Sequence, residues 1–251
     1  MLKKREFERY QRQIAIPKLG REGQRRLKEA KVFVAGAGGL GSAASLYLAA
    51  AGIGKIRIID KHRVKLNNLN RQILYSTRDI GRLKVEAAKK KLVKINPEVE
   101  IEPIAEEIGK DSLLGLIGDC GLIVDAMDNF PTRYLLNGVA IKNKIPFIHG
   151  AVEGFEGRVT TIIPKKTACL RCVYPKALPP SIVPILGATA GVIGCVQATE
   201  VIKYLTGIGQ LLTNKLLIYD GEQMTFDLLK LERNPKCPAC GSSSKGNYAG
   251  S

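Results

Sequence analysis

The sequence predicts an α/β protein in which helices cover both faces of a mostly parallel sheet. Short apolar segments alternate with helical segments between residues 31 and 151, which is the order of repeated β-α-β units. After residue 155 the strand-like segments have fewer helices between them, which predicts an antiparallel C-terminal extension. Two Cys-x-x-Cys pairs add a predicted four-cysteine metal knuckle.

Each element of the parallel part is predicted from local pattern. Residues 1–30 are basic and predicted to be helical. Short apolar segments predict the strands, and helical periodicity predicts the helices, one of which ends before Pro97. The predicted strands are 31–35, 55–60, 98–104, 122–126 and 146–151, and the predicted helices are 42–51, 82–96 and 132–144.

The pattern of the chain changes after residue 155. A strand near the sheet edge is predicted at 157–164, and a long helix at 191–206. The proline-rich residues 178–187 predict an extended loop. Residues 215–219 and 224–231 predict the two strands of a hairpin.

The composition excludes several classes of protein. Of 251 residues, 45% are hydrophobic and 25% charged, which is ordinary for a globular chain and excludes whole-chain disorder. No apolar run approaches about 18 residues, and the charged N-terminus carries no secretion signal, so we expect a cytoplasmic protein without a membrane span. The net charge of +16 gathers in residues 1–31 and 82–94. Nucleic acid, a phosphorylated ligand, an acidic protein or simply solvated helix faces would each explain it, and charge alone does not choose among them. Stacking on single-stranded nucleic acid has little support, because Trp is absent and other aromatic residues are few.

A glycine-rich turn joins the first predicted strand to the first long helix. Residues 36–41 read GAGGLG and match G-x-G-x-x-G through Gly36, Gly38, Gly39 and Gly41. Glycines let the backbone approach a phosphate, and the helix N-terminus supplies free N–H groups. Asp60 follows 19 residues after Gly41, where a carboxylate suits a ribose hydroxyl. The pattern predicts a Rossmann-like nucleotide site, for either NAD or ATP.

Nearby cations and carboxylates favour ATP over a dinucleotide. Arg71 and Lys84 follow Asp60, and such cations stabilise the charge of a triphosphate and of leaving pyrophosphate. Asp125 and Asp128 lie at the end of a predicted strand, where ligands bind in open α/β sheets and a carboxylate can hold Mg²⁺.

Four of the six cysteines form two pairs that are separated by 64 residues. Such pairs predict a closed, structural Cys₄ zinc site rather than a catalytic one, and two redox-active dithiols are the alternative. The predicted ligands are Cys169, Cys172, Cys237 and Cys240. We interpret Cys120 and Cys195 as inert core residues, and His62 and His149 as structural histidines.

These motifs together resemble the ThiF/MoeB/HesA family of E1-like adenylyltransferases. The resemblance runs from about residue 9 to residue 240. It rests on the segments RYQRQ (9–13), GAGGLG (36–41), NLNRQ (68–72), GRLK (81–84) and DAMDN (125–129), on Asp60 and on the two cysteine pairs.

The resemblance implies adenylation, with ATP, of the C-terminal glycine of a ubiquitin-like sulfur-carrier protein of the MoaD or ThiS type, ending in Gly-Gly. Molybdopterin, thiamin or thiolation pathways would use the product. The matched ATP-binding positions are Gly39, Asp60, Asn68, Arg71, Lys84, Asp128 and Asn129. The resemblance further implies Mg²⁺ on Asp128, a structural Zn²⁺ on the four cysteines, and a homodimer in which Arg12 reaches the phosphates of the neighbouring subunit. Arg12, Arg71, Lys84 and Asp128 would then be the catalytic residues.

One departure narrows the expected reaction. Some members carry a nucleophilic cysteine after the first zinc pair, but residues 173–194 contain none, which favours the MoeB-like subset that only adenylates. Other interpretations remain open: an E1-like enzyme acting on tRNA or another carboxylate, an NAD-dependent oxidoreductase, and a non-catalytic partner subunit. We expect residues 1–241 to form one domain, with a basic helical region (1–30), a nucleotide-binding part (31–155), antiparallel strands with the knuckle (156–241) and a disordered tail (242–251).

Overall fold

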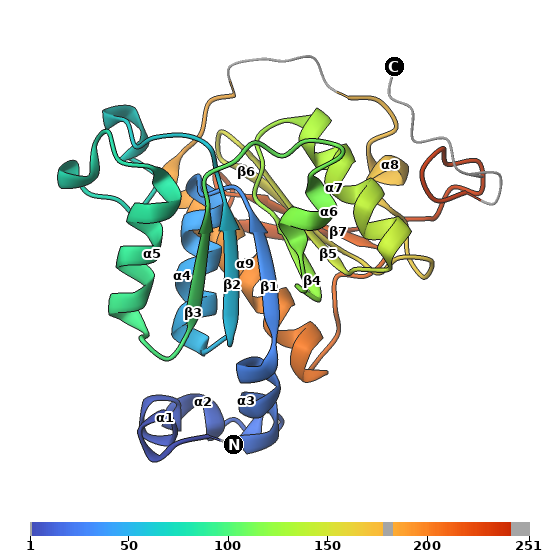
Figure 1. Cartoon of the computed structure of the whole chain (residues 1–251). Helices are drawn as coiled ribbons and strands as arrows, with labels where there is room; N and C mark the ends of the chain where they lie inside the picture. The colour runs from blue at the N-terminus through green and yellow to red at the C-terminus, as the bar shows by residue number, and fades with distance from the viewer. Residues whose placement is uncertain (1, 178–182, 242–251) are drawn as a thin grey trace.

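One eight-stranded sheet runs through the part of the chain that the computed structural model describes, residues 2–177 and 183–241 (Figure 1). The strand order is β3-β2-β1-β4-β5-β6-β7-β8. Neighbours from β3 to β5 are parallel, and those from β5 to β8 are antiparallel, which confirms the predicted mixed sheet. The strands are β1 (Lys31–Ala35), β2 (Lys55–Ile59), β3 (Glu100–Ile104), β4 (Leu122–Asp125), β5 (Phe147–Glu153), β6 (Glu156–Ile162), β7 (Lys215–Asp220) and β8 (Thr225–Lys230).

One strand prediction was wrong in its position. β6 was expected near the edge of the sheet, but the β7–β8 hairpin pairs onto it and extends the sheet by two strands. In the described part of the chain, β8 forms that edge instead. The register of β6 with β7 joins segments more than fifty residues apart, which no local pattern reveals.

The predicted helices are present, and two short ones escaped prediction. The helices are α1 (Lys4–Arg9), α2 (Gln11–Ile14), α3 (Gly20–Glu29), α4 (Gly39–Ala51), α5 (Lys84–Ile95), α6 (Leu113–Ile117), α7 (Phe130–Asn143), α8 (Leu170–Val173) and α9 (Gly187–Thr206), with the 3₁₀ turns η1 (Leu66–Asn68) and η2 (Thr77–Asp79). Because α6 and α8 have five and four residues, they are too short to give a helical period. No helix in residues 2–177 and 183–241 is long and apolar enough to cross a bilayer.

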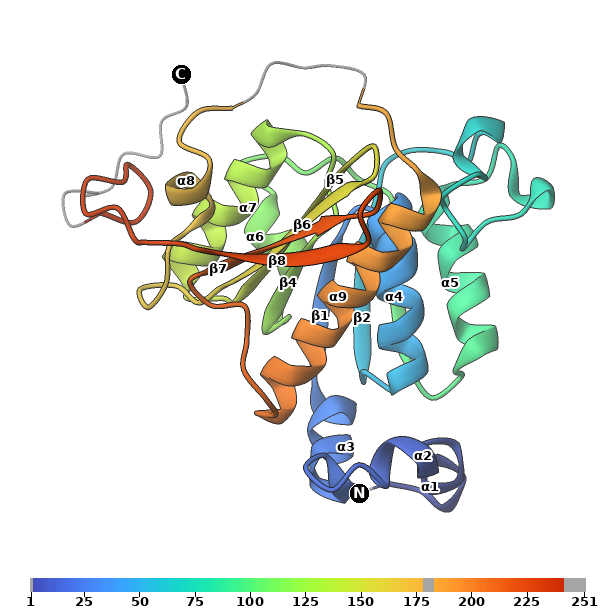
Figure 2. The same cartoon turned by 180° about the vertical axis from the view of Figure 1, so that it is seen from behind.

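Helices cover both faces of the sheet, as predicted. Figure 2 shows α4, α5 and α9 on one face, whereas α6 and α7 lie on the other. β1 serves both layers: Val32 and Val34 pack with the α4 and α9 side, and Phe33 and Ala35 pack with the α6 and α7 side. All four are fully buried, which explains why this strand is apolar at nearly every position.

The helices α4 and α9 approach each other closely because small residues line their contact. A Cβ added to Gly194 of α9 would lie 2.7 Å from both the Cβ of Ala43 and the carbonyl oxygen of Leu40. The small-residue sequence of α4 therefore serves helix packing.

The N-terminal helices lie at the end of α4 that is remote from the glycine-rich turn (Figure 1). The side-chain amides of Gln13 and Gln24 both donate to the carbonyl of Ala51, the last residue of α4, at 3.0 and 2.9 Å. At 1.5 Å per residue, the 13 residues of α4 place about 20 Å between this contact and the helix N-terminus.

The sheet has its switch point between β1 and β4. The chain leaves β1 for β2 on one side, and it leaves β4 for β5 on the other. Ligands of open α/β sheets bind in the crevice outside the carboxyl ends of such strands. The proline-rich loop was predicted over 178–187; residues 178–182 and the predicted tail at 242–251 lie outside the described residues, and Ile185 forms a bridge with Gly154.

Candidate functional site

Two different constraints explain why glycine occupies several positions of the turn after β1. Gly36 has a φ of 101°, and a Cβ there would lie 2.7 Å from the carbonyl oxygen of Ala126. A Cβ on Gly41 would overlap the Gly36 carbonyl oxygen. By contrast, a Cβ on Gly38 would meet only the side-chain nitrogen of Gln72, at 3.9 Å. Packing therefore explains Gly36 and Gly41, while the open space above Gly38 fits the approach of a phosphate to the N-terminus of α4.

This difference predicts opposite effects of substitutions at two glycines. Gly41→Ala should lower the free energy of unfolding by about 3 kcal/mol or more, because a backbone oxygen cannot move aside. Gly38→Val should leave the melting temperature near that of the native protein but weaken ATP binding. Thermal denaturation and ATP titration measure the two effects. Gly115→Ala, on the exposed side of α6 with nothing within 4 Å, is the control; a stable Gly41→Ala protein would contradict the packing argument.

Ala37, inside the turn, is held on both of its backbone groups. Its N–H donates to Asp60 Oδ2 at 3.1 Å, and its carbonyl accepts from the hydroxyl of Tyr75 at 2.7 Å. Burial raises the pKa of Tyr75, so this hydroxyl stays a donor. The other oxygen of Asp60 accepts from the backbone N–H of His62 at 2.8 Å and lies 2.9 Å from its Nδ1. Asp60 therefore lies beside the turn, and the exposed imidazole of His62 has a partner there.

The segment that contains η1 lies along the same turn. Asn68 is buried, and its side-chain oxygen accepts from the backbone N–H of Lys65 at 3.0 Å. The guanidinium of Arg71 donates to the Asn67 carbonyl and to the Asn70 side chain, both at 2.9 Å. A Cβ on Gly39 would lie 3.5 Å from the Arg71 carbonyl oxygen, which places this segment against the start of α4.

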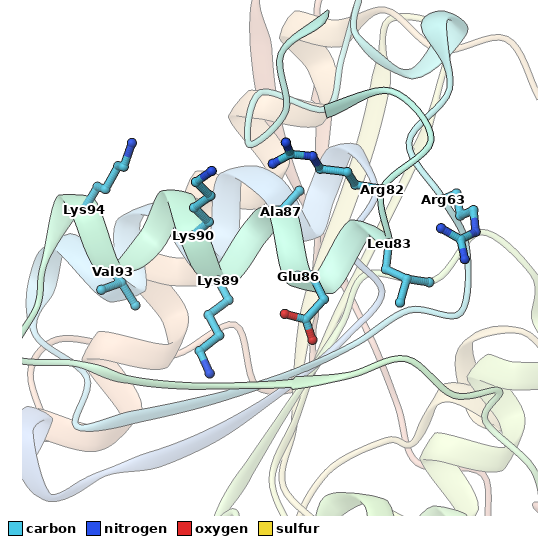
Figure 3. Close-up of a pocket in the computed structure, with 9 residues that line it drawn as sticks. All are labelled: Arg63, Arg82, Leu83, Glu86, Ala87, Lys89, Lys90, Val93 and Lys94. Atoms are coloured by element: carbon cyan, nitrogen blue, oxygen red, sulfur yellow. The ribbon is translucent and has the colours of Figure 1, made fainter. Parts of the chain in front are cut away.

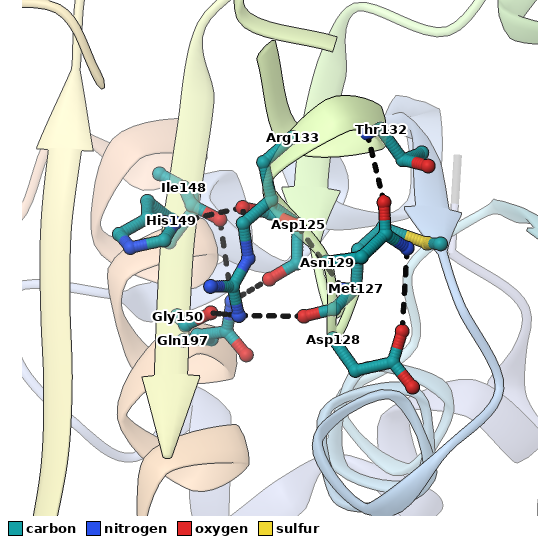
Figure 4. Close-up of polar contacts among 10 residues, drawn as sticks. All are labelled: Asp125, Met127, Asp128, Asn129, Thr132, Arg133, Ile148, His149, Gly150 and Gln197. Carbon is teal, nitrogen blue, oxygen red and sulfur yellow. Dashed lines mark hydrogen bonds and ion pairs between the residues drawn. The ribbon is translucent and has the colours of Figure 1, made fainter. Parts of the chain in front are cut away.

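The remaining predicted residues approach from α5 and from the end of β4. Lys84 begins α5 and lies 3.8 Å from Asp60 Oδ2. Asp128 is exposed, and Asn129 donates to its Oδ1 at 3.3 Å while capping α7 through the N–H of Thr132 (Figure 4). The predicted nucleotide-binding residues thus lie on segments that follow the ends of β1, β2 and β4, and their roles stay predictions.

One expectation about a charged residue needs correction, and a second stays a prediction. Asp125 was expected to be able to hold Mg²⁺, but it is fully buried and its carboxylate accepts from the N–H of Met127 and from His149. Arg12 is exposed on α2, which lies beyond the end of α4 that is about 20 Å from the glycine turn. Arg12 was expected to act on a neighbouring subunit, and that role stays a prediction.

The basic stretch 82–94 forms an open hollow rather than part of the crevice. A hollow of about 700 Å³ runs along the outer face of α5 (Figure 3). Its lining residues are Arg63, Arg82, Leu83, Glu86, Ala87, Lys89, Lys90, Val93 and Lys94. Lys84 is buried beside Asp60 instead, so most of this positive charge lies away from Asp60 and the glycine turn.

The four predicted metal ligands meet at one point. Their sulfur atoms all lie within 4.8 Å of one another. Sγ–Sγ distances are 3.9 Å for Cys169–Cys172, 3.6 Å for Cys169–Cys237 and 3.5 Å for Cys172–Cys240. A tetrahedron with metal–sulfur bonds of about 2.3 Å has edges of about 3.8 Å, so the donors fit Zn²⁺.

Thiol ionisation in this cluster is uneven. Burial and the neighbouring thiols raise the pKa of Cys169, and burial raises the pKa of Cys240 to about 11. Burial also acts to raise the pKa of Cys172, but backbone N–H groups, with that of Asn234 first, lower it. Of the other cysteines, Cys120 is buried as expected, whereas Cys195 is only half-buried on α9 and was wrongly placed in the core.

Sequence reasoning missed the supports beneath the site. Tyr75 and Gln197 bind backbone groups 38 and 72 residues away in sequence, whereas Arg133 binds the carbonyl of Met127, six residues before it. Arg133 and Gln197 come from helices whose patterns predict packing only. The sequence signal that could have identified them is a polar residue at a position within an otherwise apolar helix.

Comparisons with known proteins agree with this geometry. The model of the ThiF family matches residues 10–239. The SAMP-activating enzyme E1 of Haloferax volcanii is 42% identical over 242 residues, covering 94% of this chain and 89% of that protein. The sulfur carrier protein adenylyltransferase of Thermus thermophilus is 41% identical over 249 residues, covering 95% and 92%. The crystal structure of E. coli MccB with MccA-N7isoASN has a TM-score of 0.84 at 26% identity, covering 94% of this chain and 75% of that chain. Because the family pattern extends from the N-terminal helices to the cysteine cluster, the chain belongs to the ThiF family.

Proposed function

We propose that this protein adenylates the C-terminal glycine of a ubiquitin-like sulfur-carrier protein, with ATP as donor and pyrophosphate as product. The observation that carries the proposal is a shared location: the open glycine turn, Asp60, Lys84 and the exposed Asp128 all lie on segments that follow the carboxyl ends of β1, β2 and β4. Relatives at 41–42% identity bear the names of carrier-activating enzymes, which supports the same substrate class here.

The residues in this crevice suit phosphate chemistry without a general base. The carrier carboxylate is already ionised at neutral pH, so one of its oxygens can form the bond to the α-phosphorus as the bond to pyrophosphate breaks. Gly38 and the N-terminus of α4 would bind phosphate, and Asp60 would accept from the ribose. Arg71 and Lys84 would stabilise the charge on the departing pyrophosphate. Asp128 would hold Mg²⁺, which when bound neutralises phosphate charge.

The cysteine cluster would serve structure rather than chemistry. Four thiolates around Zn²⁺ leave no open coordination position, so the metal would tie the C-terminal segment to the chain around α8. The guanidinium of Arg233 adds a donor to the carbonyl of Lys165 at 3.1 Å, which supports the same connection. The continuous sheet from residue 31 to residue 230 supports one adenylation domain over 1–241.

Arg12 supports the proposal of a homodimer. Its distance from the crevice of its own chain leaves a second subunit as the place where it could reach phosphate. Arg12→Ala and Asp128→Ala should each inactivate the protein, and refolding the two together should restore about a quarter of native activity, since half of the random dimers contain one intact site. Pyrophosphate exchange measures this recovery. Mixtures that stay inactive, with dimers verified by light scattering, would contradict a role for Arg12 across the interface.

The proposed function is tested by ATP–pyrophosphate exchange with purified carriers. Carriers of the MoaD, ThiS and SAMP types, each ending in Gly-Gly, should be compared with versions that lack the last glycine. Exchange that requires an intact carrier supports the proposal and selects among molybdopterin, thiamin and thiolation pathways. If a folded, zinc-loaded protein gave no exchange with any carrier, the proposal would be wrong.

A further inference from the structure

The backbone that carries Asp128 is held from its buried side. The N–H of Met127 donates to Asp125 Oδ1 at 3.1 Å, and the carbonyl of Met127 accepts from Arg133 Nη2 at 2.6 Å (Figure 4). That carbonyl belongs to the same peptide group as the N–H of Asp128. Its hydrogen bond with Arg133 therefore fixes the orientation of the peptide plane between Met127 and Asp128.

The two residues that hold Met127 form a buried pair of opposite charges. Asp125 is fully buried and Arg133 is 7% exposed, with 3.8 Å between Asp125 Oδ2 and Arg133 Nε. His149 Nδ1 lies 2.7 Å from the same carboxylate oxygen. Burial lowers the pKa of His149, so the ring is neutral near pH 7 and donates its Nδ1–H. The carboxylate is thus supported from both β5 and α7.

The elements around this pair are locked to one another. Arg133 Nη2 also donates to the carbonyl of Gly150 at 3.3 Å. From α9, Gln197 donates to the carbonyls of Asp125 and Ile148 at 2.7 and 3.2 Å. A Cβ on Gly150 would lie 2.5 Å from the Gln197 side chain, so the two meet only because residue 150 is glycine. The ends of β4 and β5 cannot shift independently.

A buried ion pair is a poor way to add stability alone, because desolvation of the charges offsets most of their attraction. Here each partner also makes a hydrogen bond to one of the two peptide groups that precede the Cα of Asp128. Resting on the proposed function of Asp128, we propose that Arg133 and Asp125 are positioning residues, which fix both peptide groups of Met127 and so direct the Asp128 carboxylate into the nucleotide crevice. They need not touch ATP themselves.

The test replaces the charged pair by neutral residues of similar size. Arg133→Met/Asp125→Asn removes the donor to the Met127 carbonyl while it keeps an oxygen acceptor for the Met127 N–H. We expect Mn²⁺, used in place of Mg²⁺ in the presence of ATP, to bind about 10- to 100-fold more weakly, measured by the electron paramagnetic resonance of free Mn²⁺. Hydrogen exchange should become faster in residues 126–129 but not in the middle of β1. The kcat for pyrophosphate exchange should fall with Mn²⁺ affinity.

Glu200→Gln is the matched control. Glu200 is a carboxylate 2% exposed on α9 that pairs with Lys203 and accepts from Thr161, and it makes no contact with the Met127 turn. Its replacement should lower thermal stability and leave Mn²⁺ affinity unchanged. Native Mn²⁺ affinity in the double variant, or a loss no larger than that of Glu200→Gln, would overturn the positioning role.

The positioning role can also be tested if the double variant does not fold or if the native protein is inactive. If the double variant does not fold, Arg133→Lys answers the question: its point-like ammonium keeps the charge but not the planar fork, so Mn²⁺ affinity should still fall. A native protein that adenylates no carrier contradicts the proposed function alone, since Mn²⁺ binding and hydrogen exchange still measure positioning. A native protein that binds no Mn²⁺ with ATP overturns the positioning role.

Discussion

Asp128→Ala should abolish ATP–pyrophosphate exchange and leave the protein folded. The side chain is exposed, and its hydrogen bond in the described structure is a 3.3 Å contact with Asn129. Its removal should therefore change the free energy of unfolding by less than about 0.5 kcal/mol. The exchange rate should fall by about 10²-fold or more, because the carboxylate proposed to hold Mg²⁺ beside the phosphates is lost.

Exposed carboxylates elsewhere provide the comparison. Asp119→Ala removes another exposed aspartate, which lies before β4 and pairs with Lys31 at the opposite, amino-terminal edge of the strands, and it should leave exchange at the native rate. Arg71→Ala should lower the exchange rate as much as Asp128→Ala. It should also leave the protein folded, since the guanidinium of Arg71 donates to Asn67 and Asn70 of its own turn. An Asp128→Ala protein with native exchange would exclude the assigned role, and one that unfolds would show that Asp128 supports structure instead.

The parallel part of the fold could be predicted because its signals are local. The segment from Lys31 to Ala35 is apolar at nearly every position, and the glycine motif follows it directly. The position of β6 could not, because it depends on pairing with the distant β7–β8 hairpin. The start of α9 was also missed by four residues. The helix begins at Gly187, where a Cβ would lie 2.3 Å from the carbonyl oxygen of Asn70, a long-range contact that no local pattern reveals.

For the site, the sequence pattern predicted where the strands end but not in which direction the side chains at those ends point. Asp125 and Asp128 are three residues apart and were given the same possible role, yet one is fully buried and the other exposed. The difference arises because His149 of β5 and Arg133 of α7 contact the carboxylate of Asp125 in the interior. The family resemblance assigned Arg12 to the neighbouring subunit, and the position of α2 at the far end of α4 is compatible with that assignment.

Loss of the four-cysteine metal site should cause the largest change in stability. The cluster joins residues 68 positions apart, such as Cys169 and Cys237, and a cross-link over that span contributes about 4 kcal/mol by constraining the unfolded chain. Cys237→Ser should therefore release zinc and lower the melting temperature by about 8–16 °C. Metal analysis and thermal denaturation measure both effects, and a strong chelator should reproduce them in the native protein.

The reason lies in how the C-terminal segment is attached. Beyond β8 the described chain has no helix or strand. The segment is instead buried against the core around Leu170 through Cys237, Ala239 and Cys240. Without a metal, the sulfur atoms are left with weak hydrogen bonds, which cannot replace four metal bonds. Cys195→Ser is the control, since this half-buried thiol on α9 lies outside the cluster and its variant should keep zinc, stability and exchange activity. A Cys237→Ser protein that retains its zinc and its melting temperature would mean that the cluster does not hold this segment.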